Sequence, residues 1–340
     1  MSLPLLPLTI LKPERFFDLF YKSVDFEIQK KTSLHLHVLR IEDGEFALGP
    51  LYTQLLNHSD TYVLSRTKYA ELVSDISRYP EMRKKIQAQF KTPDENAGEG
   101  GELLLYAFLE GHLGAPKVLS KMELKTSPEL YVNGADGVHL LEVDASNYQL
   151  IFGESKMYGD TKSKPGSSIK NAIESAFKSM AETKRNLFQW DTWLVESQIM
   201  QEIADQEKIS KLAEILLPSA RAADAVKKSN AFGVFLGYEI DALDIAFEDY
   251  LDEEIESHLR QMAQDAITKQ VETIADQISK FGLGGHHFYI YAIPFLKRRT
   301  VDGVQGVQEV RMRIAEELSG RTPSVKTMNR LAEKAKQNGK

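Results

Sequence analysis

The stretch from Glu102 to Leu113 constrains the fold most, because it is apolar almost all round and long enough to form a helix. A helix with so few polar positions is buried on every side. Gly114 and Pro116 end it. Residues 117–125 then have the pattern of a strand, so this helix is expected to pack on a sheet. Helices that cover a sheet are the layered arrangement of an α/β protein.

The next two segments, residues 135–143 and 148–158, are strand candidates that predict a hairpin. Turn-forming residues separate them, namely Asp144-Ala-Ser-Asn147. A helix is expected after Ser167-Ser168, which can cap it. Its apolar positions recur at helical spacing, at Ile169, Ala172, Ile173, Ala176, Phe177 and Met180. With further strands at 231–240 and 287–293, the chain is expected to form a mixed central sheet flanked by helices.

The same signals divide the chain into four segments. Residues 1–90 are expected to form a small α/β segment, with a strand at Leu34–Ile41 and a second strand candidate at Tyr62–Ser65. Residues 91–101 are a linker by their Pro, Gly and charged content. Residues 102–300 form the core with a helical insertion, including a long acidic helix that ends near Phe281. Residues 301–340 form a helical extension with a basic tail.

Composition excludes several classes of protein. The chain has no cysteine, so disulfide frameworks and thiolate metal sites are excluded and a cytoplasmic location is expected. The N-terminus is apolar, but it lacks a basic leader and contains Pro4 and Pro7, so it is a poor signal peptide. No apolar run approaches the length of a membrane-spanning helix, and no membrane partner is expected.

Charge is unevenly distributed around the net value of −7. Residues 239–256 contain nine acids and no Lys or Arg, a run most often found on a solvated helix face. Residues 154–190 contain seven basic residues against four acids, and the segment from Ser319 onward contains six against one. The chain is therefore not a generally basic DNA-coating protein, but local contact with DNA is expected.

The polar residues on the predicted hairpin point to chemistry. Strand alternation puts Glu154 and Lys156 on one face. If Val143 pairs with Tyr148, Asp136 faces Ser155. It then lies beside Glu154 and Lys156 along the strand, but on the opposite face of the sheet. A bulge or a three-residue turn shifts the register by one residue and brings all three together, and we predict such a shift.

These residue types suit metal-dependent hydrolysis of a phosphodiester. Carboxylates such as Asp136 and Glu154 are hard oxygen ligands for Mg²⁺, for which Mn²⁺ substitutes. The ion lowers the pKa of bound water and polarises the phosphate. Lys156 can orient the water or stabilise the developing negative charge.

This pattern resembles the PD-(D/E)XK nuclease superfamily. Asp136 and Glu154-Ser155-Lys156 match its core motif, and Glu102 matches the acid that often comes from the first helix. Ala135 stands where the usual proline would be. The resemblance implies a restriction-endonuclease-like α/β core, catalysis by Asp136, Glu154, Lys156 and Glu102, and a metal site made by the three acids.

A closer resemblance is to the HamA family, the nuclease subunits of the Hachiman anti-phage defence system. It rests on Gly101–Tyr106, Gly134–His139, Gly153–Tyr158 and His287–Pro294, and it covers about residues 30–300. The family implies DNA cleavage that is restrained until infection or DNA damage is sensed. It also implies a partner, HamB, which is a superfamily 2 helicase.

Other interpretations stay open. The chain could be a stand-alone restriction or repair nuclease, or a docking subunit that uses a nuclease fold without catalysis. Glu102 could serve only the dipole of its helix. His139 is slightly favoured as an ordinary strand residue, and His286 with His287 make a poor zinc site. A basic surface after the active strand is either solvated or binds DNA phosphates, and it comprises Lys162, Lys164, Lys170 and Lys178.

Overall fold

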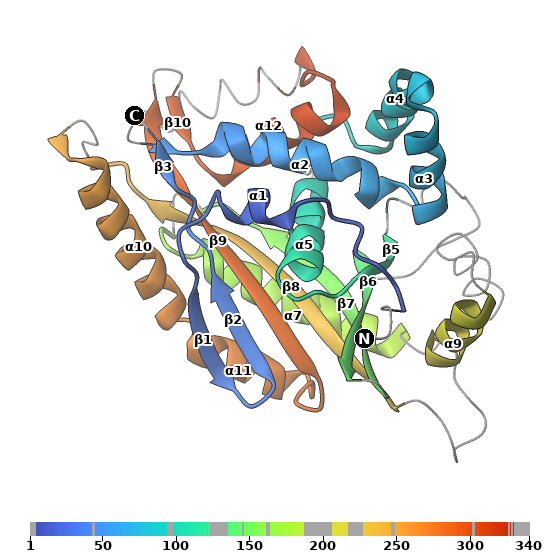
Figure 1. Cartoon of the computed structure of the whole chain (residues 1–340). Helices are drawn as coiled ribbons and strands as arrows, with labels where there is room; N and C mark the ends of the chain where they lie inside the picture. Colours follow the sequence, from blue (N-terminus) through green and yellow to red (C-terminus); the bar gives the residue numbers. More distant parts are fainter. Residues whose placement is uncertain are drawn as a thin grey trace.

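A computed structural model gives the fold of the chain (Figure 1). It describes residues 5–42, 45–93, 98–120, 122, 135–144, 146–160, 164–186, 206–216, 227–245, 249–300, 303–325, 327 and 329.

The described helices and strands occur in short runs along the chain. The helices are α1 (Pro13–Phe17), α2 (Leu48–Val63), α3 (Arg66–Ser74), the 3₁₀ turn η1 (Ile76–Arg78), α4 (Tyr79–Gln89), α5 (Glu99–Gly111), α7 (Ser168–Asn186), α9 (Gln206–Leu216), α10 (Asp252–Thr268), α11 (Val271–Lys280) and α12 (Val307–Ser319). The strands are β1 (Val24–Gln29), β2 (Thr32–Leu36), β3 (Ile41–Glu42), β4 (Glu45–Phe46), β5 (Lys117–Ser120), β6 (Gly137–Asp144), β7 (Asn147–Met157), β8 (Lys227–Asp241), β9 (His287–Thr300) and β10 (Gly303–Gln305).

The central sheet is mixed, as expected. Its strand order is β1-β2-β9-β8-β7-β6-β5, and β10 pairs with β9. Strands β2, β9, β8 and β7 run parallel to one another, whereas β6 pairs antiparallel with both β7 and β5. Strand β8 is buried at every position from Ala231 to Ile240, because central parallel strands are covered on both faces. The sheet and its helices confirm the predicted α/β class.

Helices α5 and α7 cover opposite faces of strand β7 (Figure 1). On the α5 side, a Cβ added at Gly101 would lie 3.3 Å from the hydroxyl of Ser155. On the α7 side, Ser179 donates a hydrogen bond to Glu154. The predicted apolar stripe of α7, from Ile169 to Met180, is fully buried against the sheet. The alternation of β7 thus divides its polar residues between the two helices.

The N-terminal segment contributes two strands to the same sheet. Strand β2 pairs with β9, and β1 forms the outer edge. The sheet therefore continues across the boundary expected at residues 91–101. The strand proposed at Tyr62–Ser65 is wrong, because Tyr62 and Val63 form the last turn of α2. The helix continues into these residues because they pack into the core, which overrides the strand preference of the local sequence.

The linker expected at residues 91–101 is shorter than predicted. Helix α5 begins at Glu99, so the last three linker residues are helical. Gly100 allows this helix to approach α12 closely, since a Cβ there would lie 2.6 Å from Ile314. Close packing therefore explains two glycines in a helical turn that their intrinsic preference disfavours.

The long acidic helix is also different from the prediction. It is two helices, α10 and α11, separated at Lys269 and Gln270. The acidic run begins earlier, on the end of β8. Residues 330–340 of the expected helical extension lie outside the described residues, as do residues 187–205 of the helical insertion.

Within the described ranges, no helix combines the length and the apolar character needed to cross a membrane.

Candidate active site

The predicted register shift is present in the β6–β7 hairpin. Val138 pairs with Phe152 and Glu142 with Tyr148, but the pairing shifts by one residue before Asp144 and Asn147. Val143 is the extra residue of this bulge, and its side chain is 54% exposed. The ladder ends at Val138 and Phe152, and the same register extended by two residues would set Asp136 level with Glu154. The Asp136 carboxylate contacts Ser155, the neighbour of Glu154, and its charge acts on Glu154.

Asp136 is fixed at the start of β6 by contacts with β7. Its backbone N–H donates to the carbonyl of Gly153 at 2.9 Å. Its Oδ2 atom accepts hydrogen bonds from the backbone N–H of Ser155 at 2.9 Å and from the Ser155 hydroxyl at 3.1 Å. Two donors on one oxygen hold the carboxylate plane against the strand that carries Glu154 and Lys156.

Glu154 is buried and both of its oxygens have partners. Oε1 accepts from the Lys156 ammonium at 2.5 Å, and Oε2 accepts from the Ser179 hydroxyl at 2.8 Å. Burial, and then the negative charge of Asp136, raise the pKa of Glu154 from 4.5 to about 7, although Lys156 acts in the opposite direction. Two carboxylates in a partly buried space therefore create a strong demand for positive charge.

Lys156 supplies part of that charge and remains accessible. Its side chain is 23% exposed, against 5% for Glu154. Burial by itself would lower the pKa of Lys156, but Glu154 and Asp136 outweigh this effect and raise it above the usual value. The ammonium is therefore charged at neutral pH, with one side on Glu154 and the other toward solvent.

Glu102 comes from the first turn of α5, on the other face of the sheet from α7. It is buried, and its Oε2 accepts a hydrogen bond from the Tyr62 hydroxyl at 3.2 Å. Burial, followed by the charges of Glu102 and Asp136, raises the pKa of Tyr62. Tyr62 therefore lies within electrostatic range of both acids.

The donor set fits a hard cation between Asp136 and Glu154. Both offer carboxylate oxygens, which are hard ligands, and burial followed by the charge of Asp136 raises the pKa of Glu154. In the described part of the chain, however, no three acidic or histidine side chains converge on a common point. Glu102 therefore does not form one cluster with Asp136 and Glu154, and its role as a ligand stays a prediction.

A comparison with protein families adds a second line of evidence. The family model HamA matches residues 14–313 of the 340. The chain belongs to the HamA family. It is therefore a component of the Hachiman anti-phage defence system. No match was found among the curated proteins or among the solved structures.

The basic residues expected to bind DNA follow β7 in the chain. Lys164 is exposed just before α7, and Lys170 and Lys178 are exposed on the outer face of that helix. The ammonium of Lys170 lies 3.9 Å from the carboxylate of Glu174, one helical turn further along α7. Such an exposed ion pair adds little stability. Lys162 lies outside the described residues.

Three residues that orient the HamA acids were missed by the sequence analysis. Ser155 binds Asp136, Ser179 binds Glu154, and Tyr62 binds Glu102. Ser155 could have been found, because it is the variable residue inside the Glu-x-Lys motif and faces away from its neighbours. Ser179 and Tyr62 come from distant elements, and the sequence carries no signal for their contacts.

Glu239 is not on a solvated helix face, where the acidic run was expected to lie. It belongs to the acidic run, yet it is buried, and its carboxylate accepts the backbone N–H groups of Asp160 at 2.7 Å and Val307 at 2.8 Å. Asp160 in turn accepts the N–H of Ser168 at the start of α7 at 2.7 Å. Glu239 therefore joins the end of β7 to the starts of α7 and α12, which is a structural use of a carboxylate at helix N-termini.

The three histidines considered from the sequence have other surroundings. His139 is buried, and its Nδ1 atom lies 2.8 Å from the carbonyl of Ala115. Burial lowers the pKa of His139 to about 4, so the ring is neutral. His286 and His287 lie at the start of β9, where His286 Nδ1 contacts the Asn230 carbonyl at 3.1 Å.

Proposed function

We propose that this HamA chain is a metal-dependent DNA nuclease, restrained until activated and working with a superfamily 2 helicase of the HamB kind. The observation that carries the proposal is the bulged hairpin, which brings Asp136 within electrostatic range of Glu154 and Lys156 in a mixed sheet. A structural ion pair needs no such register shift. Three groups suited to phosphodiester hydrolysis, gathered at one point of the fold, favour catalysis over a docking role.

Each residue has a defined part in the proposed reaction. Asp136 and Glu154 would hold Mg²⁺, or Mn²⁺ in its place, and Glu102 would support the ion directly or through water. The ion supplies Lewis acidity and a water of lowered pKa. Lys156 orients the attacking water and stabilises the charge that develops on the phosphate oxygens. Water adds to phosphorus while the P–O bond to the leaving strand breaks, and the leaving oxygen takes up a proton.

Several features support DNA as the substrate. The exposed lysines Lys164, Lys170 and Lys178 follow the active strand, and positive side chains position a duplex through its phosphates. Lys156 is exposed enough to reach a phosphate that approaches from solvent. Membership of an anti-phage family fits a nucleic-acid target.

The test is nicking of supercoiled plasmid by the full chain, with and without Mg²⁺, and with and without the helicase. Cleavage should require the ion, stop on addition of EDTA and be lost in Glu154→Gln. Cleavage only when the helicase is present supports the restrained complex. Full activity of the chain alone would favour a stand-alone nuclease, and no cleavage under any of these conditions would favour a docking subunit.

A further inference from the structure

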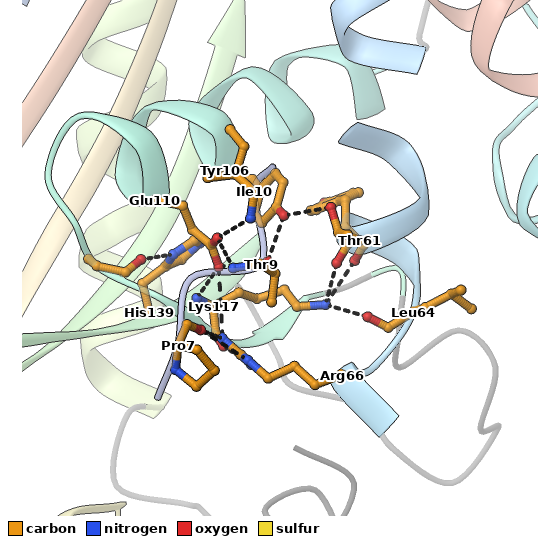
Figure 2. Close-up of polar contacts among 12 residues, drawn as sticks. Pro7, Thr9, Ile10, Thr61, Leu64, Arg66, Tyr106, Glu110, Lys117 and His139 are labelled. Atoms are coloured by element: carbon orange, nitrogen blue, oxygen red, sulfur yellow. Dashed lines mark hydrogen bonds and ion pairs between the residues drawn. The ribbon is translucent and has the colours of Figure 1, made fainter. Parts of the chain in front are cut away.

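A polar stripe runs along one side of the buried helix α5. It comprises Glu102, Tyr106 and Glu110, which are spaced four residues apart and lie on neighbouring turns. All three are buried, so each needs partners inside the protein. Figure 2 shows the partners of Tyr106 and Glu110, which come from the end of α2, the start of β5 and the N-terminal residues, and Glu102 is bonded by Tyr62 of α2. The stripe therefore connects the candidate site to distant parts of the chain.

Lys117, the first residue of β5, is wholly buried and caps α2. Its ammonium donates to the carbonyl oxygens of Thr61 at 3.0 Å, Tyr62 at 3.2 Å and Leu64 at 2.9 Å. An ammonium has three hydrogens, and the end of a helix has unpaired carbonyls and negative potential. Ser120 adds a fourth bond, from its hydroxyl to the Tyr62 carbonyl at 2.8 Å. The backbone of Tyr62 is therefore fixed from β5.

Glu110 holds Lys117 in place. Its Oε1 accepts the backbone N–H of Lys117 at 2.6 Å, and its Oε2 accepts the N–H groups of Thr9 at 2.5 Å and Ile10 at 2.7 Å. Figure 2 shows these bonds converging on one carboxylate. The start of β5 and the segment around Thr9 are thus tied to the same helix that carries Glu102.

We propose that Tyr62 is a positioning residue for Glu102, and that Lys117 and Glu110 fix Tyr62 for that purpose. The phenol of Tyr62 is buried and donates to Glu102 Oε2 at 3.2 Å. Tyr62 lies in the last turn of α2, and its carbonyl accepts hydrogen bonds from Lys117 and Ser120, so this hydroxyl has little freedom to move. The hydroxyl fixes one oxygen of Glu102 and lies within electrostatic range of Asp136. The inference rests on the proposed nuclease function, because it assigns Glu102 to the metal site.

The experiment compares Tyr62→Phe with Tyr106→Phe in the full chain. Both variants lose one buried hydroxyl, but that of Tyr106 bonds to Thr61 and Thr9 instead of Glu102. Mg²⁺ affinity is measured by calorimetry, and kcat and KM for plasmid are measured separately. Tyr62→Phe should weaken Mg²⁺ binding about tenfold, as loss of a residue that orients a ligand does. Tyr106→Phe should lower the Tm and leave Mg²⁺ affinity unchanged.

Three results would overturn the inference. If Tyr62→Phe binds Mg²⁺ like the wild type, Tyr62 has no positioning role, and the nuclease proposal stands. If both variants weaken the ion equally, the network serves folding alone. If the wild-type chain has no affinity for Mg²⁺ or Mn²⁺, the inference and the proposed function fail together. Ser120→Ala, which removes a single bond to the Tyr62 carbonyl, should produce a smaller loss of affinity in the same direction as Tyr62→Phe.

Discussion

Asp136 accepts two hydrogen bonds from Ser155 on a single oxygen, one from the backbone at 2.9 Å and one from the hydroxyl at 3.1 Å. Ser155 lies between Glu154 and Lys156, so the residue that separates the two catalytic candidates also orients the third. The hairpin therefore brings all three groups together, and Ser179 of α7 adds a hydroxyl bond to Glu154.

Ser155→Ala should slow cleavage about tenfold without unfolding the protein. A hydrogen bond to a charged group contributes about 1.5–3 kcal/mol, and the surviving backbone bond places the effect at the low end. Plasmid nicking at saturating Mg²⁺ measures it. Ser175→Ala is the matched control, because its hydroxyl contacts Tyr158 on the same side of the site as Ser179. Equal effects of the two substitutions would argue against orientation of Asp136.

Lys156→Ala should leave the fold and DNA binding intact but reduce cleavage about 100-fold to 1,000-fold, as removal of a preorganised charge does. Lys156→Ala leaves Glu154 without its positive partner. Because Lys156 acts in the chemical step, the rate is expected to fall through kcat. Lys156→Arg keeps the charge and should recover part of the rate only, because the guanidinium has a different shape. Cleavage by Lys156→Ala at the wild-type rate would rule out its part in the chemical step.

The sequence predicted the register shift of the hairpin, but it did not predict the contacts around the acids. The register shift followed from chemistry, because Asp136 needed to share a face with Glu154, and a bulge at Val143 is the simplest way. The end of α2 was misassigned because Tyr62 and Val63 favour strands locally, whereas packing on α5 decides their structure. The contact between Tyr62 and Glu102 joins residues 40 positions apart, and no local pattern encodes such a pair.

The stability of the metal-free protein should fall as pH rises through the titration of Glu154. The folded pKa of about 7 is above the ordinary value of 4.5, so the folded state binds this proton more tightly than the unfolded state. The resulting stabilisation is full below about pH 4.5 and is lost as pH rises to about 7 and beyond. Urea unfolding in EDTA measures it, with Glu154→Gln as the reference that cannot titrate. If the two stability curves stay parallel between pH 5 and 8, Glu154 is already ionised in the folded protein.

Lys170→Gln and Lys178→Gln should weaken DNA binding to a similar extent for every sequence tested. Each lysine that contacts a phosphate contributes a salt dependence of about −0.9 to the slope of log affinity against log salt. The double variant should therefore raise KM and reduce the slope by about 2, with kcat unchanged. Lys85→Gln on α4 is the control, because that exposed lysine pairs with Glu81. An unchanged slope would place the DNA on another surface.

Mutations in the acidic run of residues 239–256 can show whether it inhibits DNA cleavage or docks a partner. Glu239 is excluded, since it holds backbone amides, and the informative acids are the exposed Asp249, Asp252 and Glu253 near the start of α10. A nuclease that attacks general DNA must be restrained in its host, and these charges would repel phosphates. The effect of such repulsion fades beyond about 8 Å at physiological salt. Changing the three acids to Asn or Gln should therefore raise cleavage by the isolated chain, most clearly at low salt. Unchanged cleavage with lost helicase binding would identify a docking face, and no change in either would leave the run as a solvated surface.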